Sequence, residues 1–460
     1  MKVTFLITSF NSKARYHPGI ANLSAVLKQA GFKTDMLNVN RLDYSLIEDH
    51  IRATDPKIIA ASTNTHQYPY IKQILEFIGG KYSHIKTICG GVHPTLDENT
   101  INDIKGLDAI CKGDGEKPLL EYVRSIEQGG DRTDIPNIHF KRGSEIIRNA
   151  IDYFTEDLNE LPFPDYKIFP AYENKDLHFP MRFLFNRGCP FNCTYCCNHI
   201  LKQNYPPGKY VRYKKPQRVI DELLYFSAQY NFEQYVIDDD IFTLNKKWLL
   251  EFCDLYPGSL KSKKFAVNVR IGTVDNEILK ALKNIGCHQA QLGLESGNDG
   301  IRGKVLGRKI KQEDIISTAG AIKANGIKLH TFNMIGVPGE TRGNVMDTIR
   351  LNRTIKPDET QLTVFYPYPY TSLGEHCINN GLIKKSYADT YFMESILSRK
   401  ARGISMFEIK HLVNFFKVYV FWGWNMGKVK NELRLIMKKS LPYRAVQKIK
   451  SLSIGQGETA

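Results

Sequence analysis

The sequence lacks the features that mark membrane-spanning, secreted and disordered chains. No run of about 18 apolar residues occurs, so no segment is predicted to cross a membrane. The opening residues MKVTFLITSF lack the long apolar core and cleavage site of a signal peptide, and they predict a first β-strand. No low-complexity tract is present, and 42% hydrophobic with 24% charged residues is typical of a folded globular protein. A length of 460 residues predicts two domains plus an extension.

Cysteine usage does not fit a disulfide framework. The chain has nine cysteines, an odd number, and four of them lie within residues 189–197. This usage is typical of a cytoplasmic protein. The others are single cysteines in apolar or loop contexts, which we expect to be small buried residues rather than ligands: Cys89, Cys111, Cys253, Cys287 and Cys377.

Positive charge is concentrated near the C-terminus. Of the net charge of +15, residues 399–450 contribute most, with thirteen Lys or Arg against two Glu. Residues 408–439 also place apolar residues at helical spacing, with two tryptophans. Such a basic helix can lie peripherally on the inner face of a membrane, and it can equally be a helical cap on the preceding domain. Nucleic acid would suit the charge, but no recognised nucleic-acid-binding motif accompanies it.

Residues 1–150 alternate short apolar strands with amphipathic helices. Strands are expected at residues 3–8, 33–39, 57–62, 85–91 and 107–113, and helices at 20–31, 70–82 and 116–126. This alternation predicts a parallel, doubly wound, Rossmann-like α/β sheet. Ligands of such sheets bind at the carboxyl ends of the strands.

Three loops at those strand ends contain small residues at regular separations. Forty-two residues separate Gly19 from Ser62, which is followed by Thr63, and 27 residues separate Ser62 from the pair Gly90-Gly91. Paired glycines let a backbone approach a large ligand, although they also suit a tight turn. The pattern resembles the cobalamin-binding domain. The resemblance implies that these five residues contact cobalamin, with the serine and glycine loops around its nucleotide tail.

The lower axial histidine of cobalt is not found at its usual place. The Asp and His of the family's Asp-x-His-x-x-Gly pattern would fall on Ala14 and Tyr16, and His17 is one residue out of register. Cobalamin domains fused to radical enzymes often lack this histidine. The lower ligand is therefore left unassigned, and His17 is not assigned as one.

Residues 151–180 are rich in proline and acidic residues without a sustained period, which predicts a linker. A strand then ends on the segment NRGCPFNCTYCCNH, residues 186–199. Thiolates at Cys189, Cys193 and Cys196 can hold three irons of a four-iron cluster and leave the fourth iron open for a ligand. A structural zinc site completed by Cys197 or His199 is the alternative, but no distant second Cys or His pair supports it.

This spacing, with an aromatic residue before the last cysteine, resembles the radical S-adenosylmethionine (SAM) superfamily signature. The resemblance implies that Cys189, Cys193 and Cys196 bind a [4Fe–4S] cluster whose unique iron is chelated by SAM. It also implies that Tyr195 lies against the adenine. Cys197 has no place in the motif and is taken as a neighbour.

The chain continues to alternate after the cysteines. Strands expected within residues 234–243, 264–272, 289–297, 328–340 and 359–370, together with the cysteine strand, make six βα units. Six units predict a partial (β/α)6 barrel with its site at the C-terminal strand ends.

Several polar residues lie at those strand ends. The family resemblance implies that Asp238 or Asp240 contacts the SAM amino group, although aspartates there also cap helices. Arg270 places a permanent cation that suits a carboxylate or a structural ion pair. The family resemblance further implies SAM contacts for four residues: Glu295 and Ser296 in GLESGN, Arg308 in VLGRKI, and Pro338 in MIGVPGET.

The order of the expected domains resembles that of the class B cobalamin-dependent radical SAM enzymes. These domains are a cobalamin-like domain (1–150), a linker (151–180), a radical SAM barrel (181–375) and a basic helical region (376–460). Most of these are methyltransferases. The resemblance implies cleavage of SAM to a 5′-deoxyadenosyl radical, hydrogen abstraction from an unactivated carbon and methyl transfer from methylcobalamin, with an external flavodoxin- or ferredoxin-type reductant. A small-molecule, lipid or natural-product substrate is expected. Alternatives are a cyclase or ring-rearranging enzyme, and a zinc- or cobalamin-binding regulatory protein.

Overall fold

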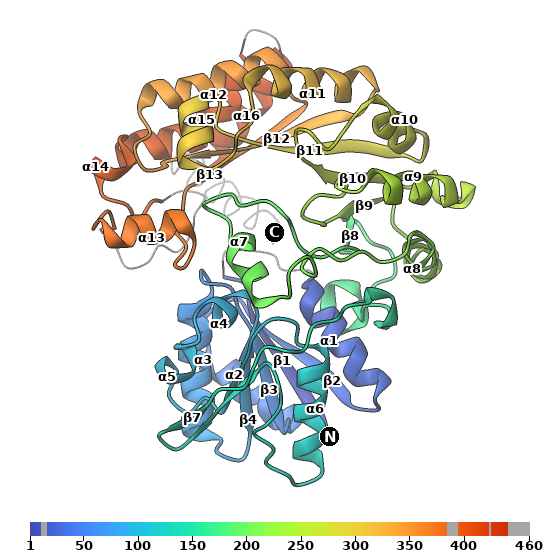
Figure 1. Cartoon of the computed structure of the whole chain (residues 1–460), viewed down its shortest axis with the longest axis vertical. Helices are drawn as coiled ribbons and strands as arrows, with labels where there is room; N and C mark the ends of the chain where they lie inside the picture. The colour runs from blue at the N-terminus through green and yellow to red at the C-terminus, as the bar shows by residue number, and fades with distance from the viewer. Residues whose placement is uncertain (11–15, 384–393, 423–424, 440–460) are drawn as a thin grey trace, which may run out of the picture. The chain divides into compact units, whose positions relative to one another are not determined.

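The computed structural model describes residues 1–10, 16–383, 394–422 and 425–439 (Figure 1). The chain forms two compact units. The first contains Met1–Ala290 and Pro367–His376, and the second contains Gln291–Tyr366 and the described residues from Cys377 onward. The domain boundaries expected from the sequence stay a prediction.

The first sheet has seven strands in the order β2-β1-β3-β4-β5-β6-β7. The strands are β1 (Lys2–Thr8), β2 (Lys33–Val39), β3 (Ile58–Ser62), β4 (Lys86–Gly90), β5 (Ala109–Cys111), β6 (Ile138–Arg142) and β7 (Glu145–Ile147). Strands β1 to β5 pair in parallel, as predicted. The hairpin β6-β7 adds an antiparallel edge that the sequence analysis did not anticipate. Strand order reverses between β1 and β3, and this switch point is where such sheets bind ligands.

Helices cover this sheet on both faces (Figure 1). They are α1 (Pro18–Gln29), α2 (Tyr44–Thr54), α3 (Tyr68–Lys81), α4 (Val92–Leu96), α5 (Thr100–Asp103) and α6 (Glu116–Glu127). Helix α1 begins at Pro18, whose fixed φ suits a first helical position, and Gly31 follows its end at φ +88°. Helix α2 was not predicted because it buries only Ile47 and Ile51, too few apolar residues for a clear period.

The predicted linker has no long regular element but is packed. It contains the short helices η1 (Leu158–Glu160), η2 (Tyr166–Ile168) and η3 (Pro170–Tyr172). Tyr166, Phe169 and Tyr172 are buried, and the ring of Tyr16 stacks on Tyr166 at 4.7 Å between centroids. Buried aromatic surface therefore fixes a segment whose sequence shows no period.

The second sheet has six strands in chain order and forms a partial barrel. The strands are β8 (Met181–Phe183), β9 (Gln234–Ile237), β10 (Lys264–Val269), β11 (Cys287–Glu295), β12 (Lys328–Ile335) and β13 (Glu359–Val364). The pairs β8-β9, β9-β10 and β12-β13 are parallel. The accompanying helices are α7 (Asn198–Leu201), η4 (Lys202–Asn204), α8 (Pro216–Gln229), α9 (Lys246–Leu255), η5 (Gly258–Leu260), α10 (Asn276–Asn284), η6 (Ile301–Val305), α11 (Gln312–Ala324), α12 (Arg342–Ile355) and α13 (Ser372–Asn379). The six expected βα units are confirmed.

The C-terminal region is helical, as predicted. It contains α14 (Arg399–Arg402), α15 (Met406–Phe421) and α16 (Met426–Lys439). Ile409, Phe416 and Phe421 of α15 are buried in an apolar cluster with residues of β12, β13 and α12. This packing favours the helical cap over the membrane-surface helix for α15. Within the described ranges, no helix combines the length and apolar character needed to span a bilayer. Residues 423–424 and 440–450 of the basic stretch lie outside the described residues.

Candidate functional site

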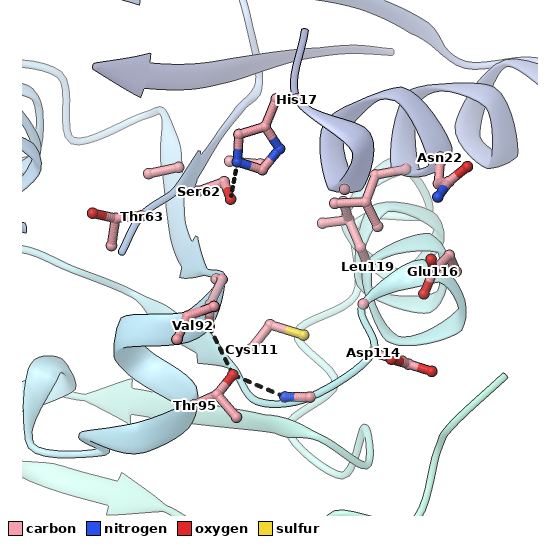
Figure 2. A pocket seen from close by; sticks show the side chains of 18 of the residues that line it. His17, Asn22, Ser62, Thr63, Val92, Thr95, Cys111, Asp114, Glu116 and Leu119 are labelled. Carbon is pink, nitrogen blue, oxygen red and sulfur yellow. Dashed lines mark hydrogen bonds between the residues drawn. The ribbon is translucent and has the colours of Figure 1, made fainter. Parts of the chain in front are cut away.

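A cavity of about 410 Å³ opens in the first unit, at the carboxyl ends of the parallel strands (Figure 2). Its volume lies in the range of small-molecule sites. The structure brings together at its wall all the residues that the sequence predicted for cobalamin: Gly19, Ser62, Thr63, Gly90 and Gly91. Gly19, Ser62 and Gly90, which lie 43 and 28 positions apart in the sequence, meet because the carboxyl ends of parallel strands share one edge of the sheet.

Gly91 gives the cavity wall its shape. Its φ of +98° is a conformation that side chains rarely adopt, and a Cβ there would lie 2.6 Å from the carbonyl oxygen of Thr63. The N–H of Thr63 donates to the carbonyl of Gly90 at 3.0 Å, which holds the two loops together. Glycine is therefore required at position 91 for the loop after β4 to pack against the loop after β3, and this packing shapes one wall of the cavity.

His17 lies at the cavity but is engaged by the protein. Its Nδ1 accepts the N–H of Ile20 at 3.3 Å, and its Nε2 lies 3.3 Å from Ser62 Oγ, as Figure 2 shows. Burial lowers the pKa of His17 to about 4, so the ring is neutral at pH 7. Tyr16, which occupies the place of the family's axial histidine, stacks on Tyr166 instead. Ala14 lies outside the described residues.

A buried network of charged residues also reaches this cavity, and sequence reasoning missed it. Arg187 Nη2 lies 2.5 Å from Glu116 Oε1, and Arg212 Nη1 lies 2.5 Å from Asp114 Oδ2. Tyr205 OH donates to Asp114 Oδ1 at 2.9 Å. Burial acts to raise the pKa of Asp114, but Arg187 and Arg212 hold it below its ordinary value. The acidic loop KGDGE after β5 and the arginine directly before the cysteine motif were the available sequence signals.

The cysteine loop follows β8. Cys189, Cys196 and Cys197 are half-buried, and Cys193 is 8% exposed. The N–H of Cys196 donates to the carbonyl of Cys193 at 3.1 Å, which turns the loop. Among the residues that the structure describes, no three His, Cys, Asp or Glu side chains form a ready-made metal site. Three thiols on one loop still fit a cluster that brings its own irons to the loop.

Gly188 and Tyr195 are two further residues of the cysteine loop. Gly188 has φ +88°, and a Cβ on it would collide with the carbonyl of Tyr210. Only glycine therefore suits the position before Cys189. Tyr195 is half-buried between Cys193 and Cys196 in the chain, and its contact with adenine stays a prediction.

The three aspartates after β9 have different surroundings. Asp238 forms a two-point ion pair with Arg182, at 2.7 Å from Nε and 2.5 Å from Nη2. Asp239 is 1% exposed and accepts the N–H groups of Phe185 and Asn186 at 2.7 and 3.1 Å; burial raises its pKa to about 7. Asp240 accepts from Asn198 Nδ2 at 3.2 Å beside the cysteine loop. Of the two predicted SAM contacts, Asp240 lies nearer to the loop's side chains, while Asp238 already has a cationic partner.

Arg270 lies over the cysteine loop. Its Nη1 is 3.7 Å from Cys193 Sγ, and its guanidinium stacks on the ring of Phe191 at 3.8 Å. The prediction placed this cation toward a ligand carboxylate, and the structure shows a cysteine sulfur as its neighbour.

The remaining predicted SAM residues, Glu295, Ser296, Arg308 and Pro338, all belong to the second unit. Glu295 ends β11 at φ +63°, and its Oε1 lies 3.5 Å from Arg308 Nη1. Arg308 Nη2 donates to the carbonyl of Gly293 at 2.6 Å, and Ser296 is fully buried. The pair Glu295–Arg308 therefore fixes the end of β11. Their contact with SAM stays a prediction.

Pro338 is buried in the loop after β12. Gly336 and Gly339 flank it with φ +77° and +76°. Glu340 is fully buried and accepts the N–H of Gly336 at 2.6 Å, while burial raises its pKa to about 8. This carboxyl group is therefore largely protonated at pH 7, and it closes the loop around Pro338.

His199, the alternative zinc ligand, is occupied by other contacts. Its Nε2 accepts the N–H of Ser372 at 3.2 Å and lies 2.9 Å from Ser372 Oγ, while Nδ1 contacts the carbonyl of Cys196. The N–H of Leu373 donates to the carbonyl of Thr194 at 2.9 Å. The segment Pro367–His376 is thus fastened to the cysteine loop through His199.

The family comparisons agree with this arrangement. The radical SAM superfamily matches residues 183–351, and the B12 binding domain matches residues 10–123. An uncharacterized methyltransferase of Pyrococcus horikoshii is 28% identical over 350 residues, 74% of each chain. The anaerobic magnesium-protoporphyrin IX monomethyl ester cyclase of Rubrivivax gelatinosus is 24% identical over 395 residues, 81% of this chain and 69% of its own.

Among solved structures, the radical SAM methyltransferase TsrM from Kitasatospora setae, with cobalamin and a [4Fe-4S] cluster bound, has a TM-score of 0.64 at 16% identity. The match covers 84% of this chain and 76% of that one, and it concerns the fold. Residues 183–351 of the chain are therefore a radical SAM domain. A B12-binding domain at residues 10–123 precedes it, so the chain combines an N-terminal B12-binding domain with a radical SAM domain.

Proposed function

We propose that this protein is a cobalamin-dependent radical SAM methyltransferase that methylates an unactivated carbon of a small-molecule, lipid or natural-product substrate. When bound, its cofactors supply one-electron cleavage of SAM and a transferable methyl group. Enzymes of this superfamily need an external one-electron reductant, and a flavodoxin- or ferredoxin-type protein suits this one.

One observation carries the proposal. The cavity that contains the five predicted cobalamin residues is also lined by residues on both sides of the cysteine motif: Leu184, Arg187, Leu201, Tyr205 and Tyr210. A ligand in this cavity would therefore border the loop proposed to hold the cluster. Adjacent placement of the two cofactors is what methyl transfer between them and one substrate requires.

The chain's own residues hold and shield the reacting groups in this proposal. Cys189, Cys193 and Cys196 ligate the cluster, while Gly90 and Gly91 leave room for cobalamin. The ion pairs of Arg187 and Arg212 hold the loop against the first sheet. Leu184 and Leu201 present apolar side chains to the cavity, and these exclude water from it.

Anaerobic reconstitution with iron, sulfide and hydroxocobalamin tests the proposal. We expect four irons and one cobalt per chain, and loss of the iron and its visible absorption when Cys189, Cys193 and Cys196 become Ala. Iron without cobalt would contradict methyl transfer. Zinc in place of iron would favour the regulatory-protein alternative.

A cyclase is the second candidate, because the Rubrivivax relative covers 81% of this chain and is named a cyclase. Product mass separates the two reactions, since each methyl transfer adds about 14 Da whereas ring closure adds no carbon. A product without the added mass, formed with consumption of SAM, would favour the cyclase.

A further inference from the structure

We propose that Arg270 is a positioning residue that raises the reduction potential of the cluster by donating a hydrogen bond to the sulfur of Cys193. The inference rests on the proposed function, because it requires an iron–sulfur cluster on the cysteine loop. It differs from the role predicted from the sequence, in which this arginine binds a carboxylate.

Contacts on two sides hold the guanidinium in place. Nη1 lies 3.7 Å from Cys193 Sγ, and the guanidinium stacks on Phe191 at 3.8 Å. The backbone of Arg270 is fixed by Thr273, whose Oγ1 accepts the N–H at 3.3 Å and donates to the carbonyl at 2.9 Å. Thr273 Oγ1 lies in turn 2.6 Å from Thr243 Oγ1. A planar guanidinium held on a ring loses little further freedom when it donates to a sulfur.

The charge of Arg270 is not neutralised by a neighbouring side chain. In the described ranges of the chain, its side chain makes no ion pair with a carboxylate, whereas Arg182 and Arg187 each do. Cys193 is 8% exposed, so water screens the interaction only weakly. The positive charge of Arg270 therefore acts mainly on the sulfur of Cys193.

The sign of the effect follows from the charge of the cluster. Reduction adds one negative charge, and a nearby cation with a hydrogen bond to a ligating sulfur stabilises the reduced form. Arg270 therefore makes the potential less negative and the cluster easier for an external protein to reduce.

Redox titration of the reconstituted full-length protein without SAM, followed by electron paramagnetic resonance, tests this role. In Arg270→Gln we expect the equilibrium constant for one-electron reduction of the cluster to fall by about three- to tenfold. A tenfold fall corresponds to a reduction potential more negative by about 59 mV. Lys202→Gln is the matched control, since Lys202 contacts Asn192 and Pro190 of the same loop and no cysteine sulfur. It should change the equilibrium less than twofold.

A potential of Arg270→Gln equal to that of the control would overturn the proposal. The same result with weakened SAM binding would assign Arg270 to the SAM carboxylate. If Arg270→Gln fails to hold a cluster, Phe191→Leu carries the test, because it removes the stacking and keeps every charge; we expect a smaller fall, and no change refutes the role. A wild-type chain that binds zinc and no iron refutes both this role and the proposed function, whereas an intact cluster with an unshifted potential refutes this role alone.

Discussion

The guanidinium of Arg187 lies 2.5 Å from a carboxylate oxygen of Glu116, although the two residues are 71 positions apart. Glu116 begins α6 of the first sheet domain, and Arg187 precedes the first motif cysteine by two positions. The main chain of Arg187 also pairs with Arg212 through two hydrogen bonds of 2.9 Å. The loop proposed for the cluster is therefore bound to the domain proposed for cobalamin by buried ionic contacts.

Replacing Asp114 by Ala should strongly destabilise the fold. Asp114 pairs with Arg212 and accepts from Tyr205 and the N–H of Thr155, so its loss leaves buried cations and donors without a partner. Removing one partner of a buried pair costs about 3–5 kcal/mol of unfolding free energy. Urea unfolding of the full chain measures it. Asp49→Ala, which removes an exposed pair with Arg52, should change little; equal effects of the two variants would contradict the prediction.

A methyl group at Gly91 should impair cobalamin binding. The added Cβ would lie 2.6 Å from Thr63 O, at a φ that alanine tolerates poorly. We expect hydroxocobalamin to bind at least about tenfold more weakly to Gly91→Ala, which corresponds to about 1.4 kcal/mol, by titration of its visible spectrum. Gly80→Ala in α3 is the control, since no atom lies within 4 Å of its added Cβ. Equal affinities for both variants would argue against the assigned cavity.

Cys197 and His199 should not be needed for metal binding. Cys197 is the neighbour of a proposed ligand, and both ring nitrogens of His199 are engaged by Ser372 and Cys196. We expect Cys197→Ala and His199→Ala each to keep about four irons per chain after reconstitution, while Cys196→Ala loses them. A loss of bound zinc in the first two variants would instead support the tetrahedral zinc site.

Glu340 should make stability depend on pH. Burial raises its pKa from 4.5 to about 8, so the native state keeps a proton that the unfolded chain releases above pH 4.5. The protonated carboxyl group therefore contributes to the free energy of unfolding. That contribution is fully present below pH 4.5 and is lost as the pH rises toward 8, by about 1.4 kcal/mol per pH unit. Glu340→Gln cannot titrate, so its melting temperature relative to wild type should rise between pH 5 and pH 8. Parallel melting profiles would show that Glu340 is already ionised in the native state.

Variants of two phenylalanines should distinguish the packing role of α15 from a role in membrane contact. Phe416 is 1% exposed in the apolar cluster of the second unit, and Phe407 is 79% exposed. Phe416→Ala should lower the unfolding free energy by about 3–5 kcal/mol, and Phe407→Ala should not. Sedimentation with anionic vesicles measures the other role. Vesicle binding that depends on Phe407 would restore the membrane-surface helix as a second function of this region.

Much of the fold was predictable because it is written in local periodicity. Strands such as Lys33–Val39 and helices such as Tyr68–Lys81 bury one face, and that face leaves a pattern in consecutive residues. The five single cysteines are buried, as expected for small apolar side chains. Helix α2 escaped prediction because it buries only two residues, and β7 because it is a three-residue strand with no buried residue.

For the charged residues at the strand ends, the sequence identified the candidates but not the partners of their side chains. Asp238 pairs with Arg182, and Arg270 faces a cysteine sulfur. Residue type and position identified these side chains as functional candidates. Their partners depend on which loops the barrel places beside them, and no spacing in the sequence encodes that.

By itself, the sequence determined the order of the two domains and the three cysteines of the cluster motif, because periodicity and short spacings are local properties. Only the tertiary structure decided that Asp114 meets Arg212, 98 positions away, and that Gly19, Ser62 and Gly91 share one cavity with residues that flank the cysteine loop. Such contacts arise when parallel strands bring their carboxyl ends to one edge and desolvated charges find partners there. That selection depends on the packing of the folded chain as a whole.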